Sequence, residues 1–251
     1  MIHYHGGPCT PESAAVRLWK ARHAFVSFAH ADQIEVAAGV CQSFALDNGA
    51  FSQWRAGKPT DWPGYYAWCR EWLSHPCCDW AVIPDVIDGD EDANDALVSE
   101  WPFRLDQGVP VWHMHETVSR FYRLCVAWPR VAIGSSGEYA TVGTGKWWAR
   151  MSKAMNAVTQ SDGRPLAKIH GLRMLDPRVF AHLPLASADS TNVARNIGID
   201  QAWQRGAYQP RSKETRAQII AEHIEQTNSA SRWMPTTDSH NYSDDLFGAA
   251  A

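Results

Sequence analysis

The sequence predicts a single-domain α/β protein of the (β/α)8 TIM-type barrel class. Short β-rich apolar runs alternate with amphipathic stretches along most of the chain, and eight such runs can be distinguished. Strict alternation is typical of parallel strands covered by helices, and eight units favour a closed barrel over an open sheet. The length of 251 residues suits one barrel, and a hydrophobic fraction of 45% suits a substantial core.

The expected elements follow one another in this alternating order. Strands are expected at residues 2–5, 24–28, 43–46, 80–84, 109–113, 131–134, 166–170 and 185–188. Helices are expected between them at residues 11–21, 62–74, 91–105, 116–127 and 146–159. The connections after the second and seventh strands are shorter and show no clear helical pattern.

The C-terminal part differs from the barrel. Ile219, Ile220 and Ile224 form an apolar stripe at helical spacing, which predicts a helix over residues 213–227. Beyond Asn228 the sequence becomes polar and rich in small residues. We therefore expect a barrel domain over residues 1–228 and a flexible tail over residues 229–251.

The composition favours a soluble protein of the cytoplasm. Residues 1–8 lack the basic and apolar regions of a signal peptide, and no stretch approaches the ~20 apolar residues of a membrane span. The six cysteines show no C-x-x-C pair, so we expect neither a metal site nor disulfides. A net charge of −4 leaves room only for a local basic groove if the partner is a nucleic acid.

Residues with reactive or hydrogen-bonding side chains, together with glycines, lie at the ends of most expected strands. They are His5-Gly6-Gly7, Asp47-Asn48-Gly49, Asp85, His113-x-His115, Gly134-Ser135, His170-Gly171 and Asp189-Ser190. Each alone has a structural explanation, because Asp caps helices and Gly allows tight turns. Together they are expected to meet at the mouth of the barrel, where barrel enzymes carry out their chemistry.

Asp47 and Asp189 follow well-separated strands and can face each other across this mouth. Such a carboxylate pair suits displacement at a sugar carbon. One carboxylate attacks C1′ and holds a covalent glycosyl intermediate, while the other moves protons at the leaving and incoming groups.

Both aspartates lie in motifs that resemble those of the tRNA-guanine transglycosylase superfamily. Residues 47–52, Asp-Asn-Gly-Ala-Phe-Ser, are similar to the motif D-S-G-G-F-Q, with Asp47, Gly49 and Phe51 matching. Asp189 is followed by Ala194-Arg195, like the family's nucleophile and its Ala-Arg. Residues 83–86 resemble the strand end whose Asp binds the guanine edge, and residues 131–135 resemble the glycine-bearing strand beside the base. The similarity keeps the family's order over roughly residues 40–200.

The resemblance implies specific roles for these residues. Asp189 would be the nucleophile, Asp47 the general acid/base, and Asp85 the acceptor for N1–H and the exocyclic amine of guanine. Where the family has a Gln, this chain has His113 and His115, either of which would contact the base carbonyl. The other residues expected around the base are Asn48, Gly49, Phe51, Gly134, Ser135 and His170.

The chain is most similar to the phage and bacterial branch that inserts 7-deazaguanine bases into DNA. The family's tRNA enzymes carry a zinc site of three Cys and one His near the C-terminus, whereas no cysteine follows Cys125 here. DNA and a free 7-deazaguanine base are therefore the expected partners, ahead of tRNA, with no cofactor and no membrane. Oligomerisation is compatible with this expectation.

Two alternatives belong to other classes. His3, His5, His113 or His115, His170 and Asp189 resemble the ligand set of a metal-dependent amidohydrolase-like barrel. Against it, no lysine ends the fourth strand, and the Asp47 motif goes unexplained. The other alternative is a catalytically inactive barrel that only binds nucleic acid, which the presence of both aspartates disfavours.

Overall fold

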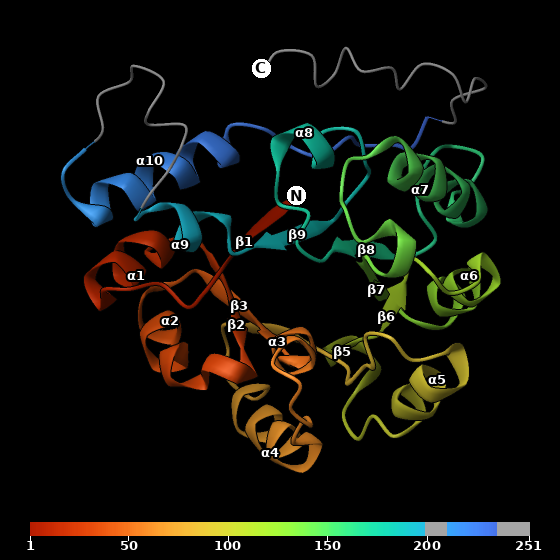
Figure 1. Ribbon diagram of the computed structural model, residues 1–251, viewed down its shortest axis with the longest axis horizontal. Coiled ribbons are helices and arrows are strands. Elements are labelled where there is room, and N and C mark those ends of the chain that lie inside the picture. Colours follow the sequence, from red (N-terminus) through yellow and green to blue (C-terminus); the bar gives the residue numbers. More distant parts are fainter. Residues whose placement is uncertain (199–209, 235–251) are drawn as a thin grey trace.

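The computed structural model describes residues 1–198 and 210–234. Within these residues, nine parallel strands form one sheet that curls into a nearly closed barrel, in the order β5-β4-β3-β2-β1-β9-β8-β7-β6. The strands are β1 (Ile2–Gly6), β2 (His23–Ser27), β3 (Ser43–Asp47), β4 (Cys78–Val82), β5 (Gly108–Val109), β6 (Val111–His113), β7 (Arg130–Gly134), β8 (Lys168–Gly171) and β9 (Ser187–Ser190). Helices surround these strands (Figure 1).

Eight strands were expected, and the difference arises at Pro110. The expected strand over residues 109–113 is divided into β5 and β6, which lie at the two ends of the sheet order. Proline has no N–H to donate to a strand ladder. The chain pairs with β4 up to Val109, and the Pro110 carbonyl then accepts a hydrogen bond from the Ala132 N–H of β7 at 2.9 Å. The two sheet edges are thus joined through one residue.

The helices follow the strands in alternation. They are α1 (Glu12–Trp19), α2 (Ile34–Val40), α3 (Ala50–Arg55), α4 (Trp62–Trp72), α5 (Glu91–Ser99), α6 (Val118–Ala127), α7 (Gly145–Val158), α8 (Pro177–Phe180), α9 (Asn192–Asn196) and α10 (Lys213–Glu225). All six expected helices are present, although α5 ends at Ser99 and not at residue 105. The connection after the second expected strand contains a 3₁₀ helix over Phe28–Gln33 followed by α2. The connection after the seventh expected strand contains the single turn α8.

Side chains divide between the two faces of the sheet because successive residues of a strand point in opposite directions. The barrel interior is filled by a cluster that includes Tyr4, Phe25, Trp80 and Ala132, with the His170 ring 4.8 Å from the Trp80 ring. A larger apolar cluster fills the space between strands and helices. The interior is therefore a packed core, open to chemistry only at its end.

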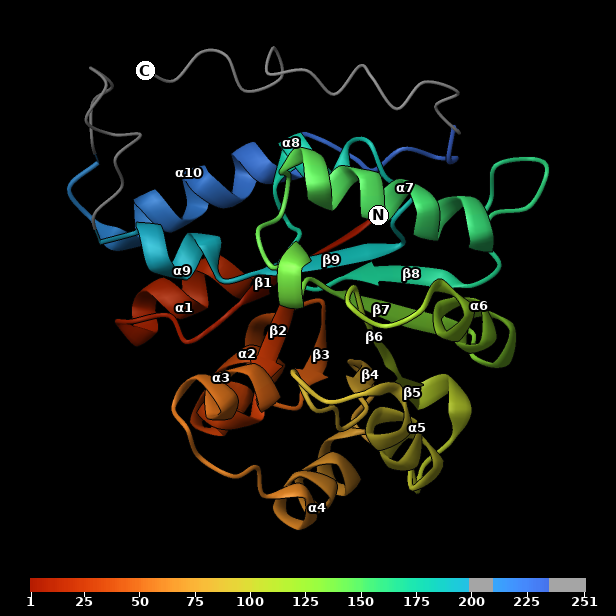
Figure 2. The ribbon, with the colours of Figure 1, turned by 45° about the vertical axis from the view of Figure 1, so that its right-hand side comes forward.

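The outer face of β1 is covered by α10. His5 Nε2 lies 2.9 Å from Glu225 Oε1, His3 Nε2 lies 2.9 Å from the carbonyl of Thr227, and Arg22 also binds Glu225. Figures 1 and 2 show α10 next to α1 and α9, with β1, β9 and β8 side by side beneath.

The expected tail begins against the barrel. Over residues 229–234, Trp233 is buried and its Nε1 donates to Asn156 Oδ1. Residues 235–251 of the expected tail lie outside the described residues. No helix among the described residues has the length and apolar character needed to cross a membrane.

Candidate active site

A pocket of about 380 Å³ lies at the carboxyl ends of the strands. This volume falls within the range of small-molecule sites, roughly 300–1,000 Å³. Eight of the expected site residues line the pocket: Asp47, Asn48, Phe51, Asp85, His113, Gly134, Ser135 and Asp189. The strand ends therefore converge as the barrel geometry requires, and three carboxyl groups share one cavity.

Asp47 ends β3 and is partly buried in this pocket. Removal from water raises the pKa of Asp47 to about 7, and the charges of Asp189 and Asp85 act in the same direction. The hydroxyl of Ser27, its register partner on β2, acts against this rise. A carboxyl group that titrates near neutral pH can both donate and accept a proton, as a general acid/base must.

Asp189 lies on β9 and is buried. Its Oδ1 accepts a hydrogen bond from the backbone N–H of Arg173 at 2.9 Å and lies 3.3 Å from His170 Nε2. His170 Nδ1 is 2.9 Å from Ser187 Oγ, and Ser187 Oγ also accepts from Arg130. The Ser187 hydroxyl can thus donate to Nδ1, which favours a proton on Nε2 facing Asp189.

His170 was expected to contact the substrate but lies below the pocket. It is fully buried among Tyr4, Phe25 and Trp80. Burial lowers the pKa of His170, although Asp189 acts to raise it. The His170 ring thus lies beneath the Asp189 carboxylate, in a contact that lacks hydrogen-bond geometry.

Asp85 follows β4 and forms the opposite wall. Asn48 Nδ2 donates to Asp85 Oδ1 at 2.6 Å and to the carbonyl of Ile83, while Asn48 Oδ1 accepts from the N–H of Ala50. His113 Nε2 lies 2.8 Å from Asp85 Oδ2, in a contact that lacks hydrogen-bond geometry. Asn48 therefore orients the Asp85 carboxylate, which lines the pocket.

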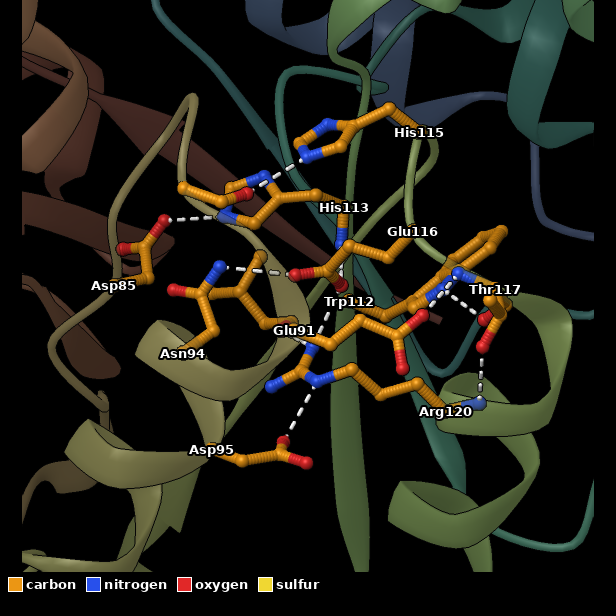
Figure 3. A network of polar contacts seen from close by, with 12 residues as sticks. Asp85, Glu91, Asn94, Asp95, Trp112, His113, His115, Glu116, Thr117 and Arg120 are labelled. Carbon is orange, nitrogen blue, oxygen red and sulfur yellow. Dashed lines mark hydrogen bonds and ion pairs between the residues drawn. The ribbon is translucent and has the colours of Figure 1, made fainter.

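A buried polar network lies behind this wall (Figure 3). Glu116 Oε2 accepts from the His113 backbone N–H at 2.9 Å and from Arg120 Nη1, and Glu116 Oε1 accepts from Asn94 Nδ2. Asn94 also bonds the N–H and the carbonyl of Val86, the residue after Asp85. The same network thus holds the two chain segments that carry Asp85 and His113.

His115 lies at the edge of the network and does not line the pocket. Its Nδ1 is 2.8 Å from Ser136 Oγ and its Nε2 is 3.0 Å from the Gly89 carbonyl. Figure 3 shows His115 beyond His113, away from Asp85. Of the two histidines, only His113 lines the pocket.

Two glycines shape the pocket. Gly49 has φ of +76° and precedes α3, so it turns the chain sharply between Asp47 and Phe51. Gly49 does not line the pocket. Gly134 does, and a Cβ there would lie 3.2 Å from His113 Nδ1, so the glycine leaves room for that ring.

Arg173 is the main residue that the sequence analysis missed. It follows β8 with φ of +57°, and its guanidinium carbon lies 3.8 Å from the centre of the Phe51 ring. Arg173 Nη2 donates to the carbonyl of Ser135 at 3.3 Å. Its position two residues after Gly171 was the available signal, because a residue that follows a barrel strand lies at the mouth.

Further cations line the same pocket. Arg55 comes from α3 and Arg195 from α9, and both are exposed. Burial lowers the pKa of Arg173, the charges of Asp189 and Asp47 act to raise it, and the charge of Arg55 has a smaller lowering effect. One side of the mouth is therefore basic.

The ligands of the metal-hydrolase alternative are not brought together. His3 and His5 point outward to α10, whereas His170 and Asp189 point into the barrel. Within residues 1–198 and 210–234, no three His, Cys, Asp or Glu side chains are arranged to hold a metal ion.

The pocket is lined by three carboxyl groups, one of which has a pKa raised to about 7, and by three arginines. No protein-family model matches this chain, and no curated protein sequence matches it.

Proposed function

We propose that this chain is a (β/α)8-barrel transglycosylase that replaces guanine in DNA with a 7-deazaguanine derivative. In this interpretation β5 and β6 act as one barrel strand interrupted at Pro110. The observation that carries the proposal is that Asp47, Asp85 and Asp189 share one pocket, in which the pKa of Asp47 is raised to about 7. The motif resemblance around Asp47 and Asp189 supports the same assignment.

The proposed reaction has two displacements at C1′ of the target nucleotide. The Asp189 carboxylate attacks C1′, the bond from C1′ to guanine breaks, and Asp47 gives its proton to the leaving base. The incoming base then transfers its N9 proton to Asp47 and attacks C1′, which releases the Asp189 carboxylate. Asp47 thus ends protonated, as it began, and no oxidant or reductant is needed.

The opposite wall would recognise the base. Asp85 would accept hydrogen bonds from N1–H and the exocyclic amine, with Asn48 fixing its orientation. His113 would contact the carbonyl edge beside Gly134. A base inside a duplex cannot reach such a pocket, so the target nucleotide would be flipped out at a cost of a few kcal/mol. We infer DNA ahead of tRNA and a cytoplasmic setting from the sequence features described above.

The test is exchange of labelled guanine and of 7-cyano-7-deazaguanine into duplex DNA and tRNA, offered in parallel. Denaturing electrophoresis with labelled DNA would detect the covalent ester on Asp189. Asp189→Asn removes the anion, so we expect neither adduct nor exchange. Asp47→Asn should lower exchange by ~10²–10⁴-fold.

The matched control is Asp88→Asn, which alters an exposed carboxylate of the β4–α5 connection outside the pocket. It should leave exchange unchanged. Full exchange by Asp189→Asn would overturn the mechanism, and an adduct that persists in that variant would overturn the nucleophile assignment.

A further inference from the structure

The side chain of Arg173 lies across the space that a stacked base would need. Its guanidinium carbon is 3.8 Å from the centre of the Phe51 ring, the distance of direct face contact. Its Nη2 donates to the backbone carbonyl of Ser135, next to Gly134 on the opposite side of the pocket. The guanidinium thus spans from α3 to the end of β7.

A guanidinium and the N1–C2–N2 edge of guanine share the same chemistry. Both are planar, both place N–H donors side by side, and both stack on an aromatic face. In the free protein Arg173 therefore makes the stacking contact with the Phe51 face that a guanine-type base would make, and it also donates to the Ser135 carbonyl.

We propose that Arg173 is a specificity-determining residue that competes with the base for the Phe51 face. The inference rests on the proposed function, because it takes the pocket to be a base site. A ligand must displace the guanidinium to stack on Phe51, and the hydrogen bonds that a guanine-type base donates to Asp85 offset the contacts of Arg173 that are lost. Arg173 thereby discriminates against planar compounds that stack without offering N–H donors.

The main chain and side chain of Arg173 act separately. The backbone N–H holds Asp189 Oδ1, and this contact does not depend on the side chain. Arg173→Ala therefore removes the competitor and leaves the support of Asp189 in place. Arg178→Ala is the matched control, since Arg178 lies in the same connection, is exposed, and pairs with Asp176 outside the pocket.

The experiment is calorimetric titration of the full chain with 7-cyano-7-deazaguanine. We expect Arg173→Ala to bind about tenfold more tightly than the unaltered protein, and Arg178→Ala to bind equally to it. Guanidinium at low millimolar concentration should weaken binding to Arg173→Ala, because the free ion can occupy the emptied position. It should have little effect on the unaltered protein.

The outcomes separate the inference from the function beneath it. Measurable binding that is equal in the unaltered protein and Arg173→Ala would overturn the role of Arg173 and leave the base site standing. A tenfold loss in Arg173→Ala would also overturn it, since Arg173 would then assist the base. No binding by any variant would overturn the base site itself, and the inference with it.

Discussion

At the scale of single residues, the carboxyl group of Asp47 destabilises the folded protein when it is ionised. The folded protein holds its proton more tightly than the unfolded chain does, since its pKa is raised to about 7. Between about pH 4 and pH 7 the native state therefore binds more protons, and the unfolding free energy falls as pH rises. This destabilisation is the expected signature of a group kept ready for proton transfer.

We expect Asp47→Asn to stabilise the protein at alkaline pH. At pH 4 both side chains are neutral, so the two proteins should be similar. At pH 8 the variant should unfold with a free energy higher by roughly 1–3 kcal/mol, because it avoids an ionised carboxylate near Asp189 and Asp85. Urea denaturation at both pH values measures the difference, and a gap that is the same at both would contradict the pKa assignment.

Arg173 gives a second prediction at this scale, from its backbone. Its φ of +57° lies in the left-handed region that disfavours side chains with a Cβ. Arg173→Gly should therefore be more stable than Arg173→Ala by about 1 kcal/mol, although both lose the guanidinium. Ala96→Gly, at an exposed position within α5, should be less stable by a similar amount. Thermal unfolding of the three variants and the unaltered protein would measure whether glycine is more stabilising than alanine at position 173 and less stabilising than alanine at position 96.

At the scale of elements, the pocket wall that carries Asp85 and His113 depends on a charge pair buried beside α5 and α6. Glu116 and Arg120 are each at most 1% exposed as side chains. Arg120 also bonds the carbonyl of Val111 on β6 and, at its outer end, Asp95 of α5. One ion pair thus joins a strand and two helices to the residues that position Asp85 and His113.

We expect Glu116→Ala to destabilise the protein by about 3–5 kcal/mol, because it leaves the Arg120 charge buried without its inner partner. The double variant Glu116→Ala with Arg120→Met should recover part of that loss, since no unpaired charge remains. Asp95→Ala, which removes only the outer, more exposed partner, should cost about 1 kcal/mol or less. Equal losses from Glu116→Ala and Asp95→Ala in urea unfolding would rule out the buried pair as the important contact.

The sequence predicts elements well where a pattern is local, and less well where a partner is distant. Alternating runs locate the strands within two residues, because apolar spacing is visible in a short window. The division of the expected strand at Pro110 depends on which neighbouring strand each half pairs with. Helix α2 is rich in small residues, so its apolar stripe is weak. Asp47, Asp85 and Asp189 can be predicted because they end strands. Glu116 and Asn94 are hydrogen-bonded to each other although they lie 22 residues apart in the sequence, and no motif reveals this pair.

At the scale of the whole molecule, the chain has a net charge of −4. The charged side chains around the mouth of the barrel are distributed unevenly. Arg55, Arg173 and Arg195 line the pocket. The connection after Asp85 carries Asp88 and Asp90, and α5 begins at Glu91. A phosphate backbone is therefore attracted to the side of α3 and α9 and repelled from the side of α5.

We expect DNA binding to be weak and strongly salt-dependent, with only a few phosphate contacts. Each lost contact lowers the log–log salt slope by about 0.9 in duplex DNA. Arg55→Gln and Arg195→Gln should each reduce the slope by about this amount, whereas Arg104→Gln, in an exposed pair with Asp106, should not. Fluorescence anisotropy over a salt series measures the slopes, and unchanged slopes in both variants would place the DNA elsewhere.

The covering of β1 by α10 has a consequence for how the chain is made. β1 is synthesised before β9 and α10, yet it pairs with β9 on one side, and His3 and His5 bind groups more than 200 residues later in the sequence. Contacts of such long sequence separation form slowly, and they cannot form before β9 and α10 have been synthesised. The nascent chain therefore exposes one edge of β1 until β9 has emerged, and the outer face of β1 is covered only after α10 has emerged.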